Sequence, residues 1–260
     1  HAELLVGGLR HAFADRARHL ADPDHADVPV DALLDPDSIA RAADRLTPGT
    51  IVPAETCGTL PGPSPGPPPD DRGTSHFSVI DESGMTVACT QTINGLFGSL
   101  VAVPAIGVVL NNEMNDFTTV PGEANLFGLS QSDRNLPSPG KRPLSSMSPT
   151  ILVRDGRTVL TAGASGGPRI ITGTLQVVLE VVQGGRSAAE AVSRPRLHHQ
   201  WRPDVVRLEA DAIARASALE AIGHETAETG AVGVVQAIVV HDDGYEPASD
   251  PRKGGRAAGW

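Results

Sequence analysis

The sequence contains few aromatic residues and few cysteines. Only 3% of its 260 residues are Phe, Trp or Tyr, so its core must be built mainly from Val, Leu, Ile and Ala. Its two cysteines, Cys57 and Cys89, form neither a CxxC pair nor a zinc-ligand spacing. We therefore expect free thiols or small buried side chains, and the cysteines indicate no redox compartment.

Long apolar runs and an excess of positive charge are also missing. No stretch of about 18 apolar residues occurs, so we expect no membrane-spanning helix in this chain. The formal net charge of -10 argues against a nucleic-acid partner, because binding a phosphate backbone requires a basic face. With 40% hydrophobic residues, the chain can form a packed core in one large domain or two small ones.

Proline and glycine are abundant in one segment, residues 60–73, which reads LPGPSPGPPPDDRG. This composition cannot pack a core or join a sheet, so it predicts a linker. Apolar spacing predicts a helix over 2–22 before the linker, and Ser38 is the expected N-cap of a second helix over 38–46. The chain opens on His1 inside the first helix, and we interpret it as a fragment or a processed product.

Strand patterns dominate after the linker. Residues 74–81 and 85–92 predict two strands joined by a tight turn, and Asp155-Gly156 predicts the turn of a second hairpin. A helix follows, with Pro168 expected at its first position and Gly184-Gly185 at its end. Hairpins followed by a helix and then mixed elements indicate an α+β fold with largely antiparallel sheets.

One short glycine-rich motif can be interpreted in two ways. Residues 163–167, GASGG, fit the G-x-S-x-G pattern of a serine nucleophile at Ser165 between a strand and a helix. The βαβ repeats and the HGGG-type loop of that enzyme class are missing from the sequence. The alternative is that the backbone N–H groups of Gly166 and Gly167 bind an oxyanion at the helix N-terminus.

Other polar clusters are ambiguous when taken alone. Ser145-Ser146 could bind a carboxylate or form a turn, and the acidic and amide groups of 111–117 could bind an ammonium group or simply end a strand. The adjacent His198 and His199 diverge on any regular element, so we treat them as structural. No metal-ligand spacing occurs, and we predict no metal and no cofactor.

Thr74 stands directly after the linker, where a strand begins. A threonine there is ordinary, unless the Gly73-Thr74 bond is cleaved. Cleavage would give Thr74 a free α-amine beside its hydroxyl, and such an amine has a pKa near 8, so it can accept the hydroxyl proton. One residue would then be both nucleophile and general base, with Thr92 and Asn94 on the adjoining strand beside it.

A series of motifs, in this order, resembles the small subunit of gamma-glutamyltransferases (glutathione hydrolases): GTSHFSVID, TQTINGLFGS, GVVLNNEMNDF, GKRPLSSMSPTI, SGGPRIITGTLQVV, RPRLHHQW and ASDPR. Upstream, AFADRARHLADPD resembles the end of that family's large subunit. The resemblance implies that 1–73 is the C-terminal end of a large subunit, with the linker at 60–73, and that 74–260 is the small, catalytic subunit. It also implies the N-terminal nucleophile (Ntn) hydrolase fold, a four-layer αββα sandwich, partial here because most of the large subunit is absent.

The same resemblance implies self-cleavage at Gly73-Thr74 and a γ-glutamyl ester on Thr74. The donor would be glutathione or another γ-glutamyl compound, and the acceptor water, an amino acid or a peptide. Thr92 would orient the nucleophile, and Gly166 and Gly167 would form the oxyanion hole. Asn94, Glu113 and Asp116 would bind the donor's α-ammonium group. Its α-carboxylate would be bound by Ser145 and Ser146. The cleavage products would form a heterodimer, in the periplasm or outside the cell.

The sequence departs from the family at three points. Phe127 stands where some relatives have a lid-loop tyrosine, and Ser75 stands where threonine is common. The arginine that pairs with the donor carboxylate would lie in the missing part, so we expect this chain alone to bind donors poorly.

Other functions remain open at this point. They are a glutaryl-cephalosporin acylase-like amide hydrolase, a truncated relative that does not mature, and a hydrolase that uses Ser165. Asn94, Glu113 and Asp116 favour a substrate with an α-ammonium group, which a glutaryl group lacks.

Overall fold

The computed structural model describes residues 2–58, 60 and 73–259, and these form two compact units, each assembled from distant parts of the chain. The first unit comprises the described parts of 1–69 with 113–145 and 198–229, and the second comprises those of 70–112 with 146–197 and 230–260. Most of the predicted linker, 61–72, lies outside the described residues. These units reflect packing, so the expected division at Gly73-Thr74 stays a prediction.

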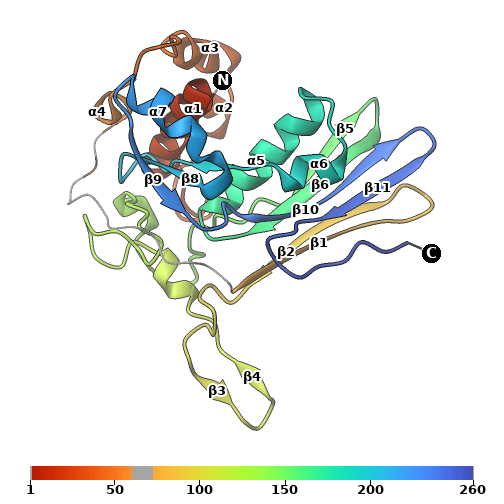
Figure 1. Ribbon diagram of the computed structural model, residues 1–260. Coiled ribbons are helices and arrows are strands. Elements are labelled where there is room, and N and C mark those ends of the chain that lie inside the picture. Colours follow the sequence, from red (N-terminus) through yellow and green to blue (C-terminus); the bar gives the residue numbers. More distant parts are fainter. Residues whose placement is uncertain (1, 59, 61–72, 260) are drawn as a thin grey trace. The chain divides into compact units, whose positions relative to one another are not determined.

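The second unit contains three layers (Figure 1). Its middle layer is an antiparallel sheet in the order β11-β10-β6-β5, with a hairpin, β1–β2, on one face and two helices on the other. The strands are β1 (Thr74–Ile80), β2 (Thr86–Thr92), β5 (Thr150–Arg154), β6 (Arg157–Ser165), β10 (Val234–His241) and β11 (Gly244–Ser249). The helices are α5 (Arg169–Val182) and α6 (Ala188–Ser193). This arrangement confirms the predicted α+β class.

The two faces of β6 have different chemistry because successive side chains alternate. Leu160, Ala162 and Ala164 are buried in the apolar core with α5, α6 and β10. Thr161 and Gly163 face the hairpin, where a Cβ on Gly163 would lie 2.3 Å from Cε1 of His76. The absence of a side chain at 163 therefore makes room for the His76 ring between the layers.

Hydrogen bonds between side chains join the hairpin to β6. His76 Nδ1 lies 2.8 Å from Thr90 Oγ1, and its Nε2 lies 3.1 Å from Ser78 Oγ. Ser78 Oγ in turn lies 3.0 Å from Thr161 Oγ1 on β6. The apolar side chains of the hairpin, among them Phe77 and Val79, point outward and are 47% and 50% exposed. The hairpin therefore depends on polar contacts with the central sheet.

The same unit contains the short β3–β4 hairpin. Its strands are β3 (Ala102–Val103) and β4 (Val108–Val109), shorter than the apolar stretch of 100–112 suggests. Pro104 lacks a backbone donor and Gly107 has φ +66°, so the turn between the strands occupies much of that stretch.

The first unit is mainly helical and contains one small sheet with the strand order β7-β8-β9. Its α-helices are α1 (Ala2–His19), α2 (Val30–Leu33), α3 (Pro36–Ala43), α4 (Ala54–Cys57) and α7 (Ala216–Glu220). Its 3-10 helices are η1 (Glu113–Asp116), η2 (Asp133–Asn135) and η3 (Ala210–Arg215). The strands are β7 (Leu197–His198), which begins one residue before this unit, β8 (Val205–Glu209) and β9 (Glu225–Thr229), with β8 and β9 parallel.

Two predicted helix starts were wrong by a few residues. Asp35, not Ser38, caps α3, because its carboxylate accepts the Ser38 N–H at 2.8 Å and Pro36 takes the first helical position. Pro168 directly precedes α5, which begins at Arg169. After β8 the chain forms the short 3-10 helix η3 and then α7.

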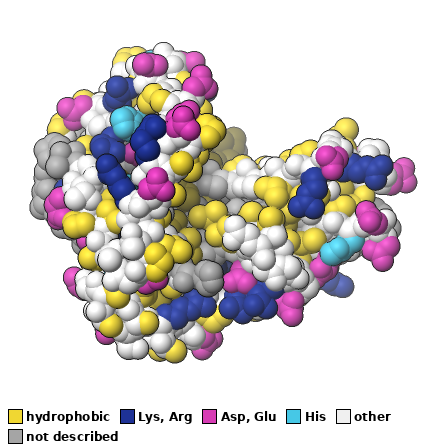
Figure 2. Space-filling view, turned by 90° about the horizontal axis from the view of Figure 1, so that it is seen from above, with side chains coloured by type: hydrophobic (Ala, Val, Ile, Leu, Met, Phe, Trp, Pro, Cys, Tyr) yellow, Lys and Arg dark blue, Asp and Glu magenta, His cyan; other side chains and the backbone are white. Residues whose placement is uncertain are grey.

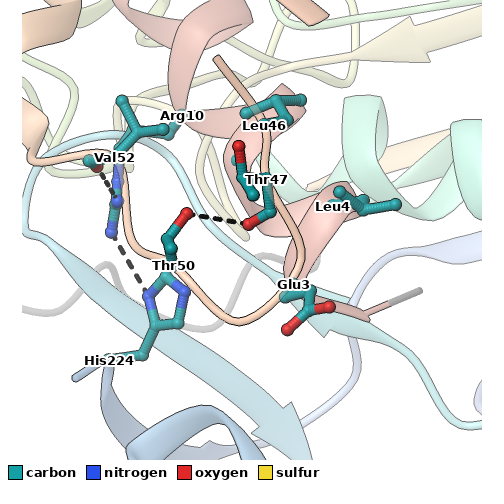
Figure 3. Close-up of a pocket in the computed structure, with 9 residues that line it drawn as sticks. Glu3, Leu4, Arg10, Leu46, Thr47, Thr50, Val52 and His224 are labelled. Carbon is teal, nitrogen blue, oxygen red and sulfur yellow. Dashed lines mark hydrogen bonds between the residues drawn. The ribbon is translucent and has the colours of Figure 1, made fainter. Parts of the chain in front are cut away.

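A charged cluster around the buried Arg10 lies in the first unit, beside a small pocket lined by residues that include Glu3, Thr50 and His224 (Figure 3). The Arg10 guanidinium forms an ion pair with Asp204 and donates a hydrogen bond to the Val52 carbonyl. His199 Nε2 lies 3.0 Å from Asp204 Oδ1, and His224 Nδ1 lies 3.4 Å from Arg10 Nη2. Burial lowers the pKa of His199. His199 therefore has a structural position, as predicted.

Several global features follow from the described residues. Cys57 and Cys89 are free thiols, as predicted. Within the described ranges, no group of three or more His, Cys, Asp or Glu residues is arranged to hold a metal ion. No helix among those residues is both long and apolar enough to cross a bilayer. On the face drawn in Figure 2, acidic and basic side chains are interspersed, so that face carries no extended basic field.

We expect the folded chain to lose stability as the pH falls from about 6.5 to about 4. Burial lowers the pKa of both His76 and His224 to about 4, so in this window the unfolded chain binds protons that the folded chain does not. The thermal midpoint should therefore be lower at pH 5 than at pH 7. His224→Gln should weaken this dependence, whereas His241→Asn, at an exposed position, should preserve it. Equal wild-type midpoints at the two pH values would contradict this account.

Candidate functional site

Thr74 and Thr92 face each other across the open end of the β1–β2 hairpin. The antiparallel register pairs them directly, and their Oγ1 atoms lie 2.9 Å apart. Thr74 is only 3% exposed, so its hydroxyl is held in a protected position. Strand pairing thus places a second hydroxyl against the candidate nucleophile.

The Thr92 hydroxyl also contacts the carbonyl group that precedes Thr74. Thr92 Oγ1 accepts the Asn94 N–H at 2.9 Å and lies 3.4 Å from the Gly73 oxygen, to which it can donate. With the Thr74 hydroxyl donating to Thr92, a chain of hydrogen bonds runs from the Thr74 hydroxyl to the Gly73 carbonyl. Such a chain polarises the carbonyl group of the bond predicted to break.

Gly73 is tightly enclosed by the turn that follows β2. A Cβ at this position would lie 2.3 Å from the Asn94 oxygen and 2.4 Å from the Gly95 oxygen. Asn94 adopts φ +72°, which asparagine tolerates better than most residues, and its Nδ2 donates to the Asn112 carbonyl at 3.1 Å. Only glycine fits at position 73 without a shift of the surrounding backbone.

Lys253 contacts the backbone of Thr74, the candidate nucleophile, and the sequence analysis did not identify it. Its Nζ donates to the Thr74 carbonyl at 2.9 Å, across 179 positions in the chain. The preceding segment is fixed by a buried ion pair, since Arg196 Nη2 lies 2.6 Å from Asp250 Oδ2. Arg196 lies in the motif RPRLHHQW and Asp250 in the motif ASDPR. These motifs were the available signal for this segment, but sequence alone did not show where Lys253 lies.

Gly166 and Gly167 lie between β6 and α5, with φ of +138° and +56°. A Cβ on Gly166 would lie 3.0 Å from the Gly233 Cα, so backbone crowding as well as conformation requires glycine there. Ser165, the last residue of β6, is 4% exposed and pairs with Val234. Ser146 also belongs to this unit, and its carbonyl accepts a hydrogen bond from Ser148.

Three further predicted residues, Glu113, Asp116 and Ser145, belong to the first unit. Arg16 on α1 donates to the Ser145 carbonyl at 3.3 Å. Burial lowers the pKa of Arg16 to about 10, and the negative charge of Asp116 partly opposes this shift. Arg16 was also missed in the sequence, because a charged residue on a helix gives no local sign of burial.

Phe127, at the lid-loop position, is 5% exposed within the first unit. The Gln200 amide donates to the carbonyl groups of Phe127 and Gly128 at 3.2 and 3.1 Å. His198 Nε2 lies 2.8 Å from Gln200 Oε1 and orients that amide. The HHQW motif thus supports this loop from within the same unit.

Comparison with known proteins supplies the family. The gamma-glutamyltranspeptidase family profile matches residues 1–260. The glutathione hydrolase proenzyme of Escherichia coli (strain K12) is 40% identical over 252 residues, covering 96% of this chain and 43% of the relative. This chain therefore spans less than half the length of that relative.

Solved structures agree with this result. A T380A mutant of Helicobacter pylori gamma-glutamyltranspeptidase is 42% identical with a TM-score of 0.65, over 68% of this chain and 99% of that one. A cephalosporin acylase from Bacillus halodurans, 22% identical, shares the fold alone, with a TM-score of 0.78 over 98% of this chain and 44% of that one. The predicted Ntn-hydrolase fold is thereby confirmed. Because the family profile covers every residue and the curated relative matches nearly all of the chain, this protein belongs to the gamma-glutamyltranspeptidase family.

Proposed function

We propose that this chain is the catalytic part of a γ-glutamyl hydrolase or transferase that matures by cleavage of its Gly73-Thr74 bond. The observation that carries the proposal is the Thr74–Thr92 hydroxyl pair, which adjoins the Gly73 carbonyl in a member of this family. Relatives that carry the name proenzyme support the cleavage step.

In the cleavage step, Thr74 Oγ1 attacks the Gly73 carbonyl carbon. The peptide C–N bond breaks, its nitrogen gains the proton that the hydroxyl loses, and an ester joins Gly73 to Thr74. Water then hydrolyses the ester, which frees a carboxylate on Gly73 and an α-amine on Thr74. Thr92 can assist by donating to the carbonyl oxygen as negative charge develops there.

In catalysis, the new α-amine takes the proton from the Thr74 hydroxyl, and Oγ1 attacks the donor's γ-carbonyl carbon. The N–H groups of Gly166 and Gly167 stabilise the oxyanion, and the leaving amine takes up the proton. The Lys253 cation beside the Thr74 carbonyl favours the uncharged amine, which is the basic form. Water or an acceptor amine then cleaves the γ-glutamyl ester.

The donor's α-amino acid end accounts for the remaining predicted residues. Asn94, Glu113 and Asp116 would bind its ammonium group, and Ser145 and Ser146 its carboxylate. A substrate with both groups, such as glutathione, uses all of these contacts, whereas a glutaryl group has no ammonium group for the acidic side chains to bind. We therefore propose γ-glutamyl compounds as donors, and water, amino acids or peptides as acceptors.

We further propose that the two cleavage products remain bound as a heterodimer. Contacts inside the first unit already join residues before Gly73 to residues after Thr74. Arg142 forms an ion pair with Asp22 at 2.5 Å, and the Trp201 indole donates to the Ala54 carbonyl at 2.8 Å. These buried or partly buried contacts do not depend on the bond that is cut. By family resemblance, we place the protein in the periplasm or outside the cell.

Exchange of the two candidate nucleophiles tests the proposed function. In the whole protein, including the upstream part that relatives possess, Thr74→Ala should abolish both cleavage and turnover of γ-glutamyl-p-nitroanilide. Ser165→Ala should keep both rates within about 3-fold of wild type, which corresponds to roughly 0.6 kcal/mol in activation free energy. Intact mass should show a wild-type chain that begins Thr-Ser-His-Phe.

The opposite pattern, with Ser165→Ala inactive and Thr74→Ala active, would identify a serine hydrolase instead. An uncut, inactive wild-type protein would identify a relative that does not mature. Turnover of glutaryl amides in preference to γ-glutamyl amides would favour the acylase alternative.

Thr92→Val should slow cleavage about 10-fold, which corresponds to the loss of roughly 1.4 kcal/mol of transition-state stabilisation. Valine keeps the shape of threonine but removes the hydroxyl that contacts Thr74 and Gly73. The time course of cleavage in purified precursor measures the effect. Thr86→Val removes a hydroxyl at the far end of the same strand, where it contacts Thr158 on β6, so it controls for loosening of the hairpin and should cleave at the wild-type rate.

Gly73→Ala should prevent or strongly slow cleavage while Thr74 is still present. The added methyl group would overlap the Asn94 and Gly95 oxygens, so the Gly73-Thr74 peptide must move away from Thr92. Gly8→Ala on α1, where nothing lies within 4 Å of the added methyl group, controls for the loss of a glycine. Normal cleavage of Gly73→Ala would show that the tight enclosure is unimportant.

A further inference from the structure

Two segments of the first unit carry proposed donor-binding residues. The first is η1, which contains Glu113 and Asp116, and the second ends at Ser145. An α-amino acid bears its ammonium and carboxylate groups on one carbon, so these two segments must be held at a definite separation. The side chain of Asn135, at the end of η2, joins them.

The Asn135 side chain both donates and accepts hydrogen bonds. Its Nδ2 donates to the Asp116 carbonyl at 2.7 Å, and its Oδ1 accepts the Leu144 N–H at 3.1 Å, one residue before Ser145. Its Nδ2 also donates to Gln131 Oε1 at 3.1 Å. A single planar amide therefore connects the backbone at Asp116 to the backbone beside Ser145.

The contacts of Asn135 leave little freedom for movement. The residue is fully buried, and its backbone N–H and carbonyl are paired with Ser132 and Thr118. The Gln131 amide reinforces the connection by donating to the same Asp116 carbonyl at 3.1 Å. Removing the Asn135 amide would leave the Leu144 N–H without its acceptor in a partly buried setting, which is costly.

A second side chain reaches the same two segments. Arg16, which is 7% exposed on α1, donates to the Ser145 carbonyl and lies near the Asp116 carboxylate. Neither Arg16 nor Asn135 has a role in the chemistry proposed above. Two buried side chains from separate parts of the chain thus converge on the segments that bear the proposed donor contacts.

We propose that Asn135 is a positioning residue that sets the separation between the ammonium-binding and carboxylate-binding segments. This inference rests on the proposed function. Asn135 acts through the backbone of Asp116 and Leu144, which adjoin proposed donor contacts and not the reacting atoms, so it governs donor binding more than the chemical step. Its loss should raise KM for the donor and spare kcat.

The test compares Asn135→Ala with Gln176→Ala in the whole, processed enzyme. Gln176 is a matched control, because its buried amide also joins two backbone segments, through Thr172 and Leu197. With γ-glutamyl-p-nitroanilide, Asn135→Ala should raise KM about 10-fold and change kcat less than about 2-fold. Gln176→Ala should lower the thermal midpoint while leaving KM unchanged.

Hydrogen–deuterium exchange supplies a readout that does not depend on turnover. In Asn135→Ala, peptides that contain Thr118 and Leu144 should exchange faster than in wild type, and in Gln176→Ala they should not. The variant Asn135→Asp keeps the acceptor for the Leu144 N–H and loses the donors to Asp116 and Gln131. It should therefore keep Leu144 protected, and it serves as the second variant if Asn135→Ala fails to fold.

The outcomes separate this inference from the proposed function. A wild-type enzyme without γ-glutamyl turnover would overturn the proposed function and this inference with it. An active wild type together with an unchanged KM in both Asn135 variants would overturn the inference alone. Equal rises of KM in Asn135→Ala and Gln176→Ala would show a general loss of stability and would also overturn it.

Discussion

The candidate site depends on one close approach, that of Gly73 to the turn after β2. Because position 73 has no side chain, the Asn94 and Gly95 carbonyl groups can enclose it, and Thr92 comes within reach of both the Gly73 carbonyl and the Thr74 hydroxyl. The register of β1 against β2 supplies the pairing, and the hydroxyl contacts to β6 hold the hairpin on the central sheet. A side chain at position 73 would overlap the Asn94 and Gly95 oxygens, and the Gly73 carbonyl would move out of reach of the Thr92 hydroxyl.

The second unit therefore holds the proposed reaction chemistry on a rigid framework. The apolar face of β6 packs against α5, and α5 begins directly after the crowded Gly166-Gly167 turn. The buried Arg196–Asp250 ion pair fixes the segment that brings Lys253 to the Thr74 carbonyl. The hairpin contributes two hydroxyl groups, the turn before α5 two backbone N–H groups, and the terminal segment the Lys253 ammonium, and packing at some distance positions each of them.

Much of this was predictable because it rests on local pattern. Strand-like segments predicted β1 and β2, and the Asp155-Gly156 turn predicted the hairpin of β5 and β6. The family motifs indicated Thr74, Thr92 and the glycine pair, because each of these lies within one short motif. The cap of α3 was misplaced because a helix that begins on proline takes its cap from the residue before it, Asp35 rather than Ser38.

The sequence by itself determined the element types, the family and the candidate nucleophile, since these depend on local composition and on motifs that short segments carry. Tertiary structure alone decided that Lys253 contacts Thr74, that His76 lies between two layers, and that Asn135 joins Asp116 to Leu144. Such contacts arise when a chain folds back on itself, and burial determines whether a polar side chain holds the structure together or faces water. The identity of one residue in a sequence does not specify which distant residue it will contact in the folded protein.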